Sequence, residues 1–182
     1  FRPLPANAET GSVRLKPIAD AFISSGYPNS NNPSGDLSVS NNFSPDIITK
    51  SLVRFDLNQI PSGATINSAN FGVYVDNCSP HLSQPALSVR RLISIWGETT
   101  VTWSTNIRTT DTGMVSPSES TCAFENTIDF NVKEIVQAWT NGSSNYGFLI
   151  SGSESQVYEQ YYFSRDHAMV YPYLEINYSY AP

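Results

Sequence analysis

Short runs in which apolar and polar residues alternate recur along this chain. In VRFDL, Val53, Phe55 and Leu57 fall on one side of an extended strand. Arg54 and Asp56 fall on the other side. A period of two residues is the signature of a strand with one buried face. The same kind of pattern predicts strands over residues 17–23, 36–40, 50–57, 70–75, 86–93, 101–103, 127–132, 146–151, 157–164 and 173–180.

Segments rich in Gly, Pro, Asn and Ser separate these runs, and such residues set the geometry of turns. Many short strands at this spacing indicate a sandwich or barrel, because two apolar sheet faces must cover each other. NVKEIVQAWTNG departs from the pattern, since Val132, Ile135 and Trp139 recur there at helical spacing. We therefore predict an all-β fold, a jelly-roll-like antiparallel β-sandwich with one short helix.

A length of 182 residues suits one domain with one main core. Residues 1–13 carry two prolines and no clear period, so we expect an N-terminal arm or linker there. The β-sandwich domain is then expected to occupy residues 14–182.

Composition and charge narrow the class of protein. Charged residues make up only 14% of the chain, which is rich in Tyr, Ser, Asn and Thr, as is typical of secreted all-β domains. We therefore expect an extracellular or cell-surface location. The formal net charge of -6 argues against nucleic acid and anionic membranes as partners, because phosphate binding needs a basic surface. No run of the sequence approaches the ~20 apolar residues of a membrane-spanning helix.

Cys78 and Cys122 are the two cysteines, and neither belongs to a CxxC motif. They fit either two buried thiols or one disulfide, and the secreted type of composition favours the disulfide. Asn42, Asn141 and Asn177 each begin an Asn-x-Ser sequon, which predicts glycosylation of an exported chain.

Residues suited to catalysis are sparse. His81 and His167 are the two histidines, and neither lies in a serine-nucleophile elbow or a zinc-binding helix motif. Acidic residues on strands keep an all-β protein soluble and blunt its edges, so we predict that the protein is not an enzyme. No cofactor is required, although Asp20 and Asp36 lie in or beside Asn-rich loops, where hard oxygen ligands suit a structural calcium ion.

Aromatic side chains exceed what a core of this size needs, and we expect several to point outward. Sugar rings stack their apolar C–H faces on flat aromatic side chains, while nearby polar groups bind the hydroxyls. We interpret Trp103 and Trp139 as core residues, and Trp96 as either core or site. Exposed tyrosines would equally suit a protein interface. The aromatic candidates are Tyr27, Trp96, Tyr158, Tyr162, Tyr173 and Tyr180.

KSLVRFDLNQIPSGATINSANFGVYV resembles the central pattern of the DNRLRE-type domains. These extracellular β-sandwich modules include the family-96 carbohydrate-binding modules and disaggregatase-related surface proteins. WGETTVTW is similar to their W-x-E-x-x-V-T-W segment, and IDFNVKEIVQAWTNGSSNYGFLIS to their V-x-x-W-x-x-G-x-x-N-Y-G segment. PIADAFISSGYPNSNNPSGDLSV and FSRDHAMVYPYLEINY resemble the opening and closing strands. The resemblance covers residues 14–180.

The resemblance implies a non-catalytic extracellular module that binds a polysaccharide or cell-surface glycan through aromatic and arginine residues on one sheet face. SSGYPNSNNPSG, the first loop, has no Lys or Arg, so a neutral or weakly charged glycan fits as well as a polyanion. Arg54 and Asp56 lie in a segment shared by modules of differing ligands, and we interpret them as scaffold that fixes strand register. The predicted carbohydrate-binding residues are Tyr27, Arg90, Arg91, Trp96, Tyr162 and Arg165.

A second function also fits the sequence, that of a structural subunit of an extracellular filament, surface layer or adhesin. A flexible arm at residues 1–13 would add a strand to the open edge of a neighbouring sandwich. The partner of the protein would then be a second copy of itself.

Overall fold

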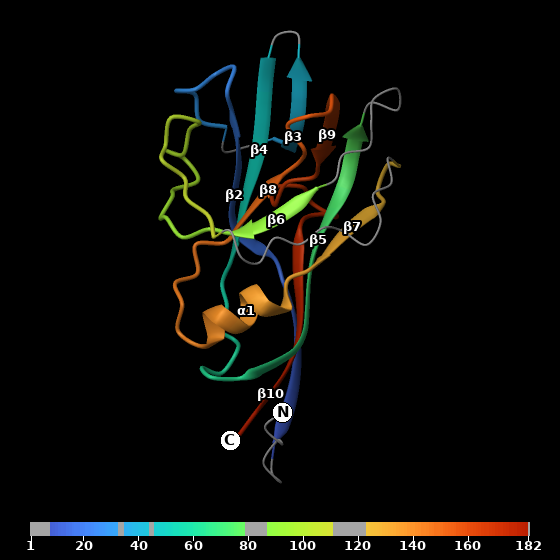
Figure 1. The fold of residues 1–182 in the computed structure, drawn as a ribbon. Helices are drawn as coiled ribbons and strands as arrows, with labels where there is room; N and C mark the ends of the chain where they lie inside the picture. Colours follow the sequence, from blue (N-terminus) through green and yellow to red (C-terminus); the bar gives the residue numbers. More distant parts are fainter. Residues whose placement is uncertain (1–7, 33–34, 44–45, 79–86, 111–122, 182) are drawn as a thin grey trace.

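The computed structural model describes residues 8–32, 35–43, 46–78, 87–110 and 123–181. Over these residues it forms ten antiparallel strands and one short helix (Figure 1). The predicted all-β sandwich with one short helix is confirmed. The elements are β1 (Glu9–Leu15), β2 (Pro17–Ser24), β3 (Leu37–Phe43), β4 (Asp46–Phe55), β5 (Thr65–Cys78), β6 (Ser88–Arg91), β7 (Thr127–Asn131), α1 (Lys133–Thr140), β8 (Phe148–Ser151), β9 (Tyr158–Tyr162) and β10 (Tyr173–Tyr180).

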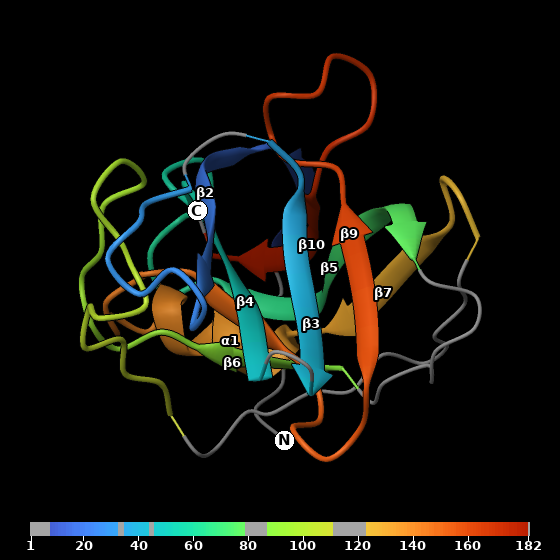
Figure 2. The ribbon, with the colours of Figure 1, turned by 90° about the horizontal axis from the view of Figure 1, so that it is seen from above.

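The long strand β5 joins the two layers of the sandwich. Its first part pairs with β10 on one side and β7 on the other, and its last residues pair with β9. One layer therefore runs β1-β10-β5-β7, and the other continues through β9, β3, β4, β8 and β6. In the second layer β2 lies on the opposite side of β4 from β3 and β8. Figure 2 shows β4, β3 and β9 side by side, as these pairings require.

Aromatic rings fill the space between the layers. Phe71 on β5 stacks on Phe148 of β8, with ring centroids 4.9 Å apart, and on Phe130 of β7 at 5.8 Å. Trp139 of α1 contacts the same Phe148 at 4.9 Å. The helix thus closes one end of the main core, as its apolar spacing predicts. Such rings contribute through both buried area and ring geometry.

The strand β4 is buried on both of its faces. Val53 and Phe55 point into the main core, as the alternation in VRFDL predicts. Leu52 points the other way and is fully buried as well, because the loop of residues 92–110 covers that side. We call the apolar residues on that side the outer cluster. It comprises Ala19, Ala21, Ile23, Leu52, Leu92, Trp96, Val101 and Leu149, with Trp103, Ile107 and Tyr146 packed against it.

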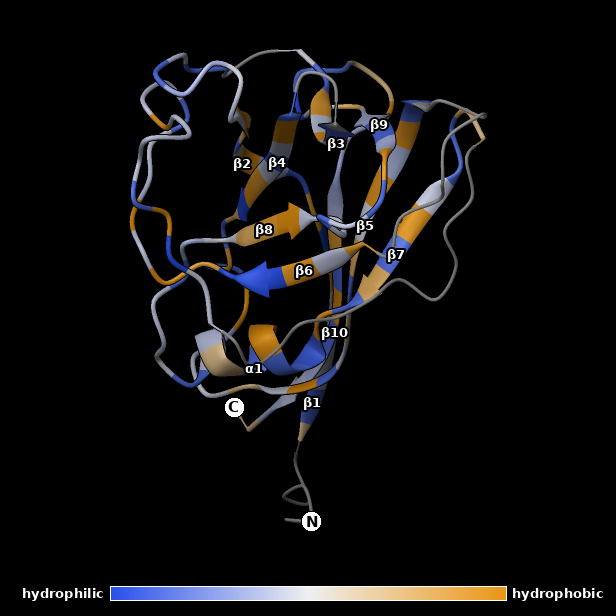
Figure 3. Ribbon diagram, turned by 45° about the horizontal axis from the view of Figure 1, so that its top comes forward, coloured by the Kyte–Doolittle hydropathy of each residue, from blue (hydrophilic) through white to orange (hydrophobic). Residues whose placement is uncertain are grey.

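Two predictions about the strands differ from the structure. Residues 101–103 do not form a strand, because the Val101 N–H donates to the Gly97 carbonyl oxygen at 2.9 Å and so belongs to a turn. Residues 9–13, assigned to the arm, lie in β1 and pair with β10 of the same chain, from Glu9 opposite Tyr180 onward. Figure 3 shows β1 and β10 running side by side away from the helix. The part of the arm that the structure describes is therefore a strand of the sandwich.

The Asn-Tyr-Gly motif before β8 has a steric explanation. Asn145 donates its Nδ2 to the Phe55 carbonyl oxygen at 2.8 Å and accepts the Gly147 N–H on Oδ1 at 3.0 Å. Gly147 has φ of 88°, and a Cβ there would lie 2.2 Å from the carbonyl oxygen of Val53. Only glycine combines this backbone conformation with so close an approach to β4.

We predict that Gly147→Ala destabilises the protein more than Gly142→Ala. Gly142 has φ of 100°, and a Cβ there would meet open space, so its substitution introduces backbone strain alone, about 1–3 kcal/mol. Gly147→Ala adds a clash with β4 worth roughly 1–3 kcal/mol more. Urea unfolding of both variants measures the difference, and equal losses would refute the steric explanation.

Candidate functional site

A groove lies over the outward faces of β4, β6 and β8. It consists of two adjoining hollows of about 450 Å³ and 380 Å³. Both hollows are lined by Lys50, Ile107 and Leu149, so they are continuous. The two strands β4 and β8 are adjacent in the sheet and supply Lys50 and Leu149 to its floor, while Ile107 comes from the covering loop.

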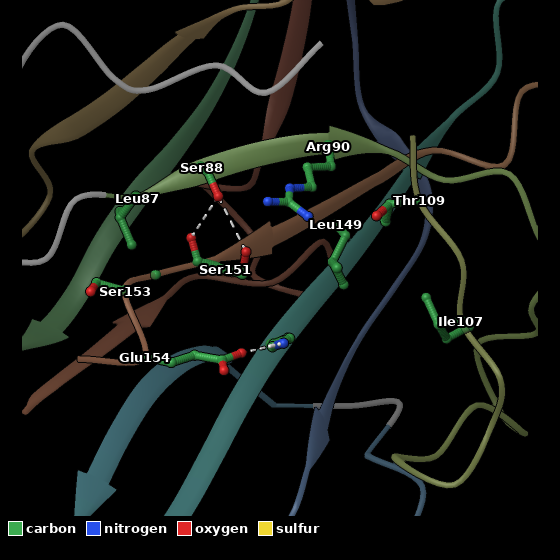
Figure 4. Close-up of a pocket in the computed structure, with 11 residues that line it drawn as sticks. Leu87, Ser88, Arg90, Ile107, Thr109, Leu149, Ser151, Ser153 and Glu154 are labelled. Atoms are coloured by element: carbon green, nitrogen blue, oxygen red, sulfur yellow. Dashed lines mark hydrogen bonds and ion pairs between the residues drawn. The ribbon is translucent and has the colours of Figure 1, made fainter. Parts of the chain in front are cut away.

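One half of the groove is polar (Figure 4). Alternation along β6 places Val89 in the main core and Ser88 and Arg90 on the outward face. The Ser88 hydroxyl donates to the Ser151 carbonyl oxygen at 3.3 Å. Lys50 Nζ forms an ion pair with Glu154 Oε1 at 2.9 Å. Hydroxyl groups and charges of both signs therefore line this half.

The other half of the groove has an aromatic side. Trp103, Ser104 and Asn106 of the covering loop face Ile23 of β2 across the floor. Trp103 is half-buried against the outer cluster, and Lys50 Nζ lies 5.5 Å from its ring centroid. An apolar surface flanked by a few hydroxyl and amide groups is the usual composition of a small-ligand site.

The predicted carbohydrate-binding residues are only partly brought together. Arg90 lines the groove, whereas the half-buried Arg91 does not. Trp96 is 5% exposed, donates its Nε1 to the Tyr146 carbonyl oxygen at 2.7 Å, and lies under the Arg54 guanidinium. Trp96 is therefore a core residue. Of the two interpretations that its sequence allowed, core or binding site, its burial supports the core.

The remaining aromatic candidates divide between core and surface. Tyr162 is fully buried, and its hydroxyl donates to Gln160 Oε1. The expectation that Tyr162 points outward is thereby corrected, because its ring has no face open to a ligand. Tyr158 and Tyr173 are buried as well. Tyr27 is 67% exposed. The carbonyl oxygen of the next residue, Pro28, accepts a hydrogen bond from the Ser104 N–H, so the loop that carries Tyr27 borders the aromatic half of the groove.

Arg165 forms an ion pair within the fold. Its Nε and Nη2 donate to Oε1 and Oε2 of Glu98 at 2.7 and 3.1 Å. Glu98 Oε1 also accepts the Asp20 N–H at 2.9 Å, and Asp20 Oδ2 accepts the Arg165 N–H at 2.7 Å. We call these three residues the acid-arginine cluster. The cluster joins the opening strand, the W-x-E segment and the segment after β9, and Arg165 lies outside the groove lining.

The two predicted calcium ligands lie in different environments. Burial, together with the neighbouring Glu98 charge, raises the pKa of Asp20 to about 7, although the hydrogen bond from the Arg165 backbone opposes this rise. Asp36 is exposed ahead of β3, and partial burial and the nearby Asp76 raise its pKa. Within the described part of the chain no three His, Cys, Asp or Glu side chains gather as a metal site. Calcium binding stays a prediction.

Several modification sites and one histidine stay untested. Cys122, the Cys78 side chain and His81 lie outside the described residues, so the disulfide remains a prediction. The three asparagines predicted to be glycosylated, Asn42, Asn141 and Asn177, are exposed. Exposure makes them accessible to glycosylation, and their occupancy is a prediction as well.

A β-sandwich that carries a mixed aromatic and polar groove on one sheet has the build of a small ligand-binding domain. The model of carbohydrate-binding module family 96 matches residues 11–178, and the chain belongs to this family. This confirms the resemblance found in the sequence. Carbohydrate-binding modules are non-catalytic and typically extracellular. This agrees with the expectation of a non-catalytic module and with that of an extracellular location. No curated protein matches the chain, and no helix in its described part is long and apolar enough to cross a membrane.

We predict that Asp20 makes the stability of the protein depend on pH. The carboxyl has an ordinary pKa of 3.8 and a pKa of about 7 in the fold, so between these values the folded state binds more protons than the unfolded state. Its contribution to stability is therefore complete below pH 3.8 and is lost as the pH rises to about 7. Asp20→Asn should remove roughly 2–4 kcal/mol of this decline.

Urea unfolding from pH 4 to 8 measures this effect. The matched control is Asp46→Asn, which changes an exposed carboxyl at the start of β4 and should leave the pH profile of the wild type intact. An Asp20→Asn profile parallel to that of the wild type would contradict the assignment.

Proposed function

We propose that the groove on β4, β6 and β8 is where this module binds polysaccharide. The observation that carries the proposal is the continuity of an aromatic half and a polar half across Lys50, in a chain of a carbohydrate-binding family. In this proposal Trp103 takes the role that the sequence suggested for Trp96 and Tyr162. Secretion of the chain, which would bring the groove to a glycan, belongs to the same proposal.

The two halves suit neighbouring sugar units of one chain. The C–H face of one ring would stack on Trp103, with the amide and hydroxyl groups of Asn106 and Ser104 beside it. The hydroxyls of the next unit would meet Arg90 as donor and Glu154 as acceptor. Because Lys50 and Arg90 are balanced in part by Glu154, the groove suits a neutral or weakly charged glycan.

We predict that Trp103→Ala and Arg90→Ala each weaken polysaccharide binding about tenfold or more, since central aromatic and arginine contacts dominate such sites. Calorimetric titration against a panel of soluble polysaccharides, neutral glycans first, measures the affinities. Circular dichroism checks that both variants are folded.

Phe124→Ala is the matched control, because Phe124 is 66% exposed and its ring packs edge-on against Phe163, outside the groove. Its affinity should equal that of the wild type. If Trp103→Ala and Arg90→Ala also bind as the wild type does, the glycan lies elsewhere on the domain.

Self-assembly is the second candidate function. It is supported by β1, which pairs with β10 alone among the described residues and so has an open edge. An exposed edge can accept a strand from another copy.

Removal of residues 1–8 tests self-assembly without deleting β1, which begins at Glu9. For a binding module we expect the intact and the truncated protein to elute as monomers in sizing with light scattering, with or without calcium. Multimers that need residues 1–8 would favour the structural subunit.

A further inference from the structure

The wall of the groove is a long loop, residues 92–110. Its β-pairing, among the residues that the structure describes, is an isolated bridge between Leu92 and Thr109. Its internal hydrogen bonds join its two ends, as between the Ile93 N–H and the Arg108 carbonyl oxygen at 2.9 Å, and close short turns between them, as between the Thr105 N–H and the Thr102 carbonyl oxygen at 3.0 Å. A loop of this length has many alternative conformations, and fixing one of them costs conformational entropy. The position of Trp103 therefore depends on contacts that anchor the loop to the sandwich.

Glu98 provides the charged anchor of this loop. Its carboxylate accepts three hydrogen bonds, one from the Asp20 N–H and two from the Arg165 guanidinium. The side chains of Glu98 and Arg165 are 19% and 31% exposed, so this pair is shielded more than an ordinary surface ion pair. The planar guanidinium fixes the carboxylate in orientation as well as in position.

The anchor is connected to the groove over a few residues. Asn31 donates its Nδ2 to the carbonyl oxygens of Glu98 and Val101, at 3.0 and 2.6 Å. Val101 is buried in the outer cluster, against which Trp103 packs. Glu98 lies in the turn that the Val101 N–H closes on the Gly97 carbonyl oxygen, and Trp103 follows Val101 by two residues. A shift of Glu98 would therefore reach Trp103 through Val101.

We propose that Glu98 and Arg165 are positioning residues for the groove, which hold Trp103 at the orientation that the glycan needs. Neither residue lines either hollow. Arg165 thus influences binding through the loop, in place of the direct sugar contact that the sequence suggested. This inference rests on the proposed function of the groove.

The test compares Arg165→Lys, Arg165→Gln and Glu98→Gln with the wild type in two measurements. We expect affinity for the polysaccharide of the panel that the wild type binds most tightly to fall about tenfold or more. We also expect amide hydrogen exchange in residues 97–105 to become faster. Arg165→Lys should also be impaired, because a lysine cannot donate two parallel N–H groups to one carboxylate. Glu98→Gln keeps the size of the side chain and carries the test if an Arg165 variant fails to fold.

Arg14→Gln is the matched control, because Arg14 forms an ion pair with Glu175 on the layer of β1 and β10 and should leave both measurements unchanged. Lost affinity with unchanged exchange in residues 97–105 would overturn the proposal and restore Arg165 as a direct contact. Unchanged affinity would overturn it as well. If the wild type binds no polysaccharide, the function of the groove fails, and the exchange rates alone then decide whether the ion pair holds the loop.

Discussion

The burial of β4 on both faces is the constraint on which the rest of the structure depends. An antiparallel sheet commonly leaves one face to water, but in β4 both Val53 and its neighbour Leu52 are fully buried. The main core covers one face, and the covering loop with Trp96 and Val101 covers the other. The groove opens at Lys50 and Leu149, which border both hollows. The groove is thus a consequence of incomplete cover over a second apolar face.

The family motifs serve mainly to attach this cover. Within WGETTVTW, Trp96 and Val101 pack into the outer cluster and Glu98 binds Arg165, while Trp103 alone lines the groove. Arg54 lies 5.4 Å from the Trp96 ring centroid and helps to hold it. This agrees with its interpretation as scaffold. A motif that builds the scaffold identifies the family well and says little about the ligand.

Every strand except β1, and the helix, could be predicted because periods of two and 3.6 residues are local signals. The prediction of a strand at VTW was wrong, because its apolar side chains pack in or against the outer cluster while its backbone joins no strand ladder. In β9 the alternation was visible, but Tyr158 and Tyr162 share the inward face with a polar Gln160, so the sequence did not show which face is buried. Alternation around Val89 did contain the signal that Arg90, and not Arg91, faces the groove.

The acid-arginine cluster could not be derived from local pattern, because Glu98 and Arg165 lie 67 residues apart in the chain. For the same reason Lys50 and Glu154, which are 104 residues apart, were not predicted as a pair in the groove. Such contacts exist only once the strands have been placed, and a single sequence carries no signal for them.

Amide hydrogen exchange of the intact protein with and without a polysaccharide that it binds would test the central claim most directly. The account predicts slower exchange of residues 103–109 and 148–154 on binding, with β1, β10 and β7 unchanged. Protection confined to the layer of β1, β10, β5 and β7 would contradict it, because the glycan would then lie on the opposite face of the sandwich.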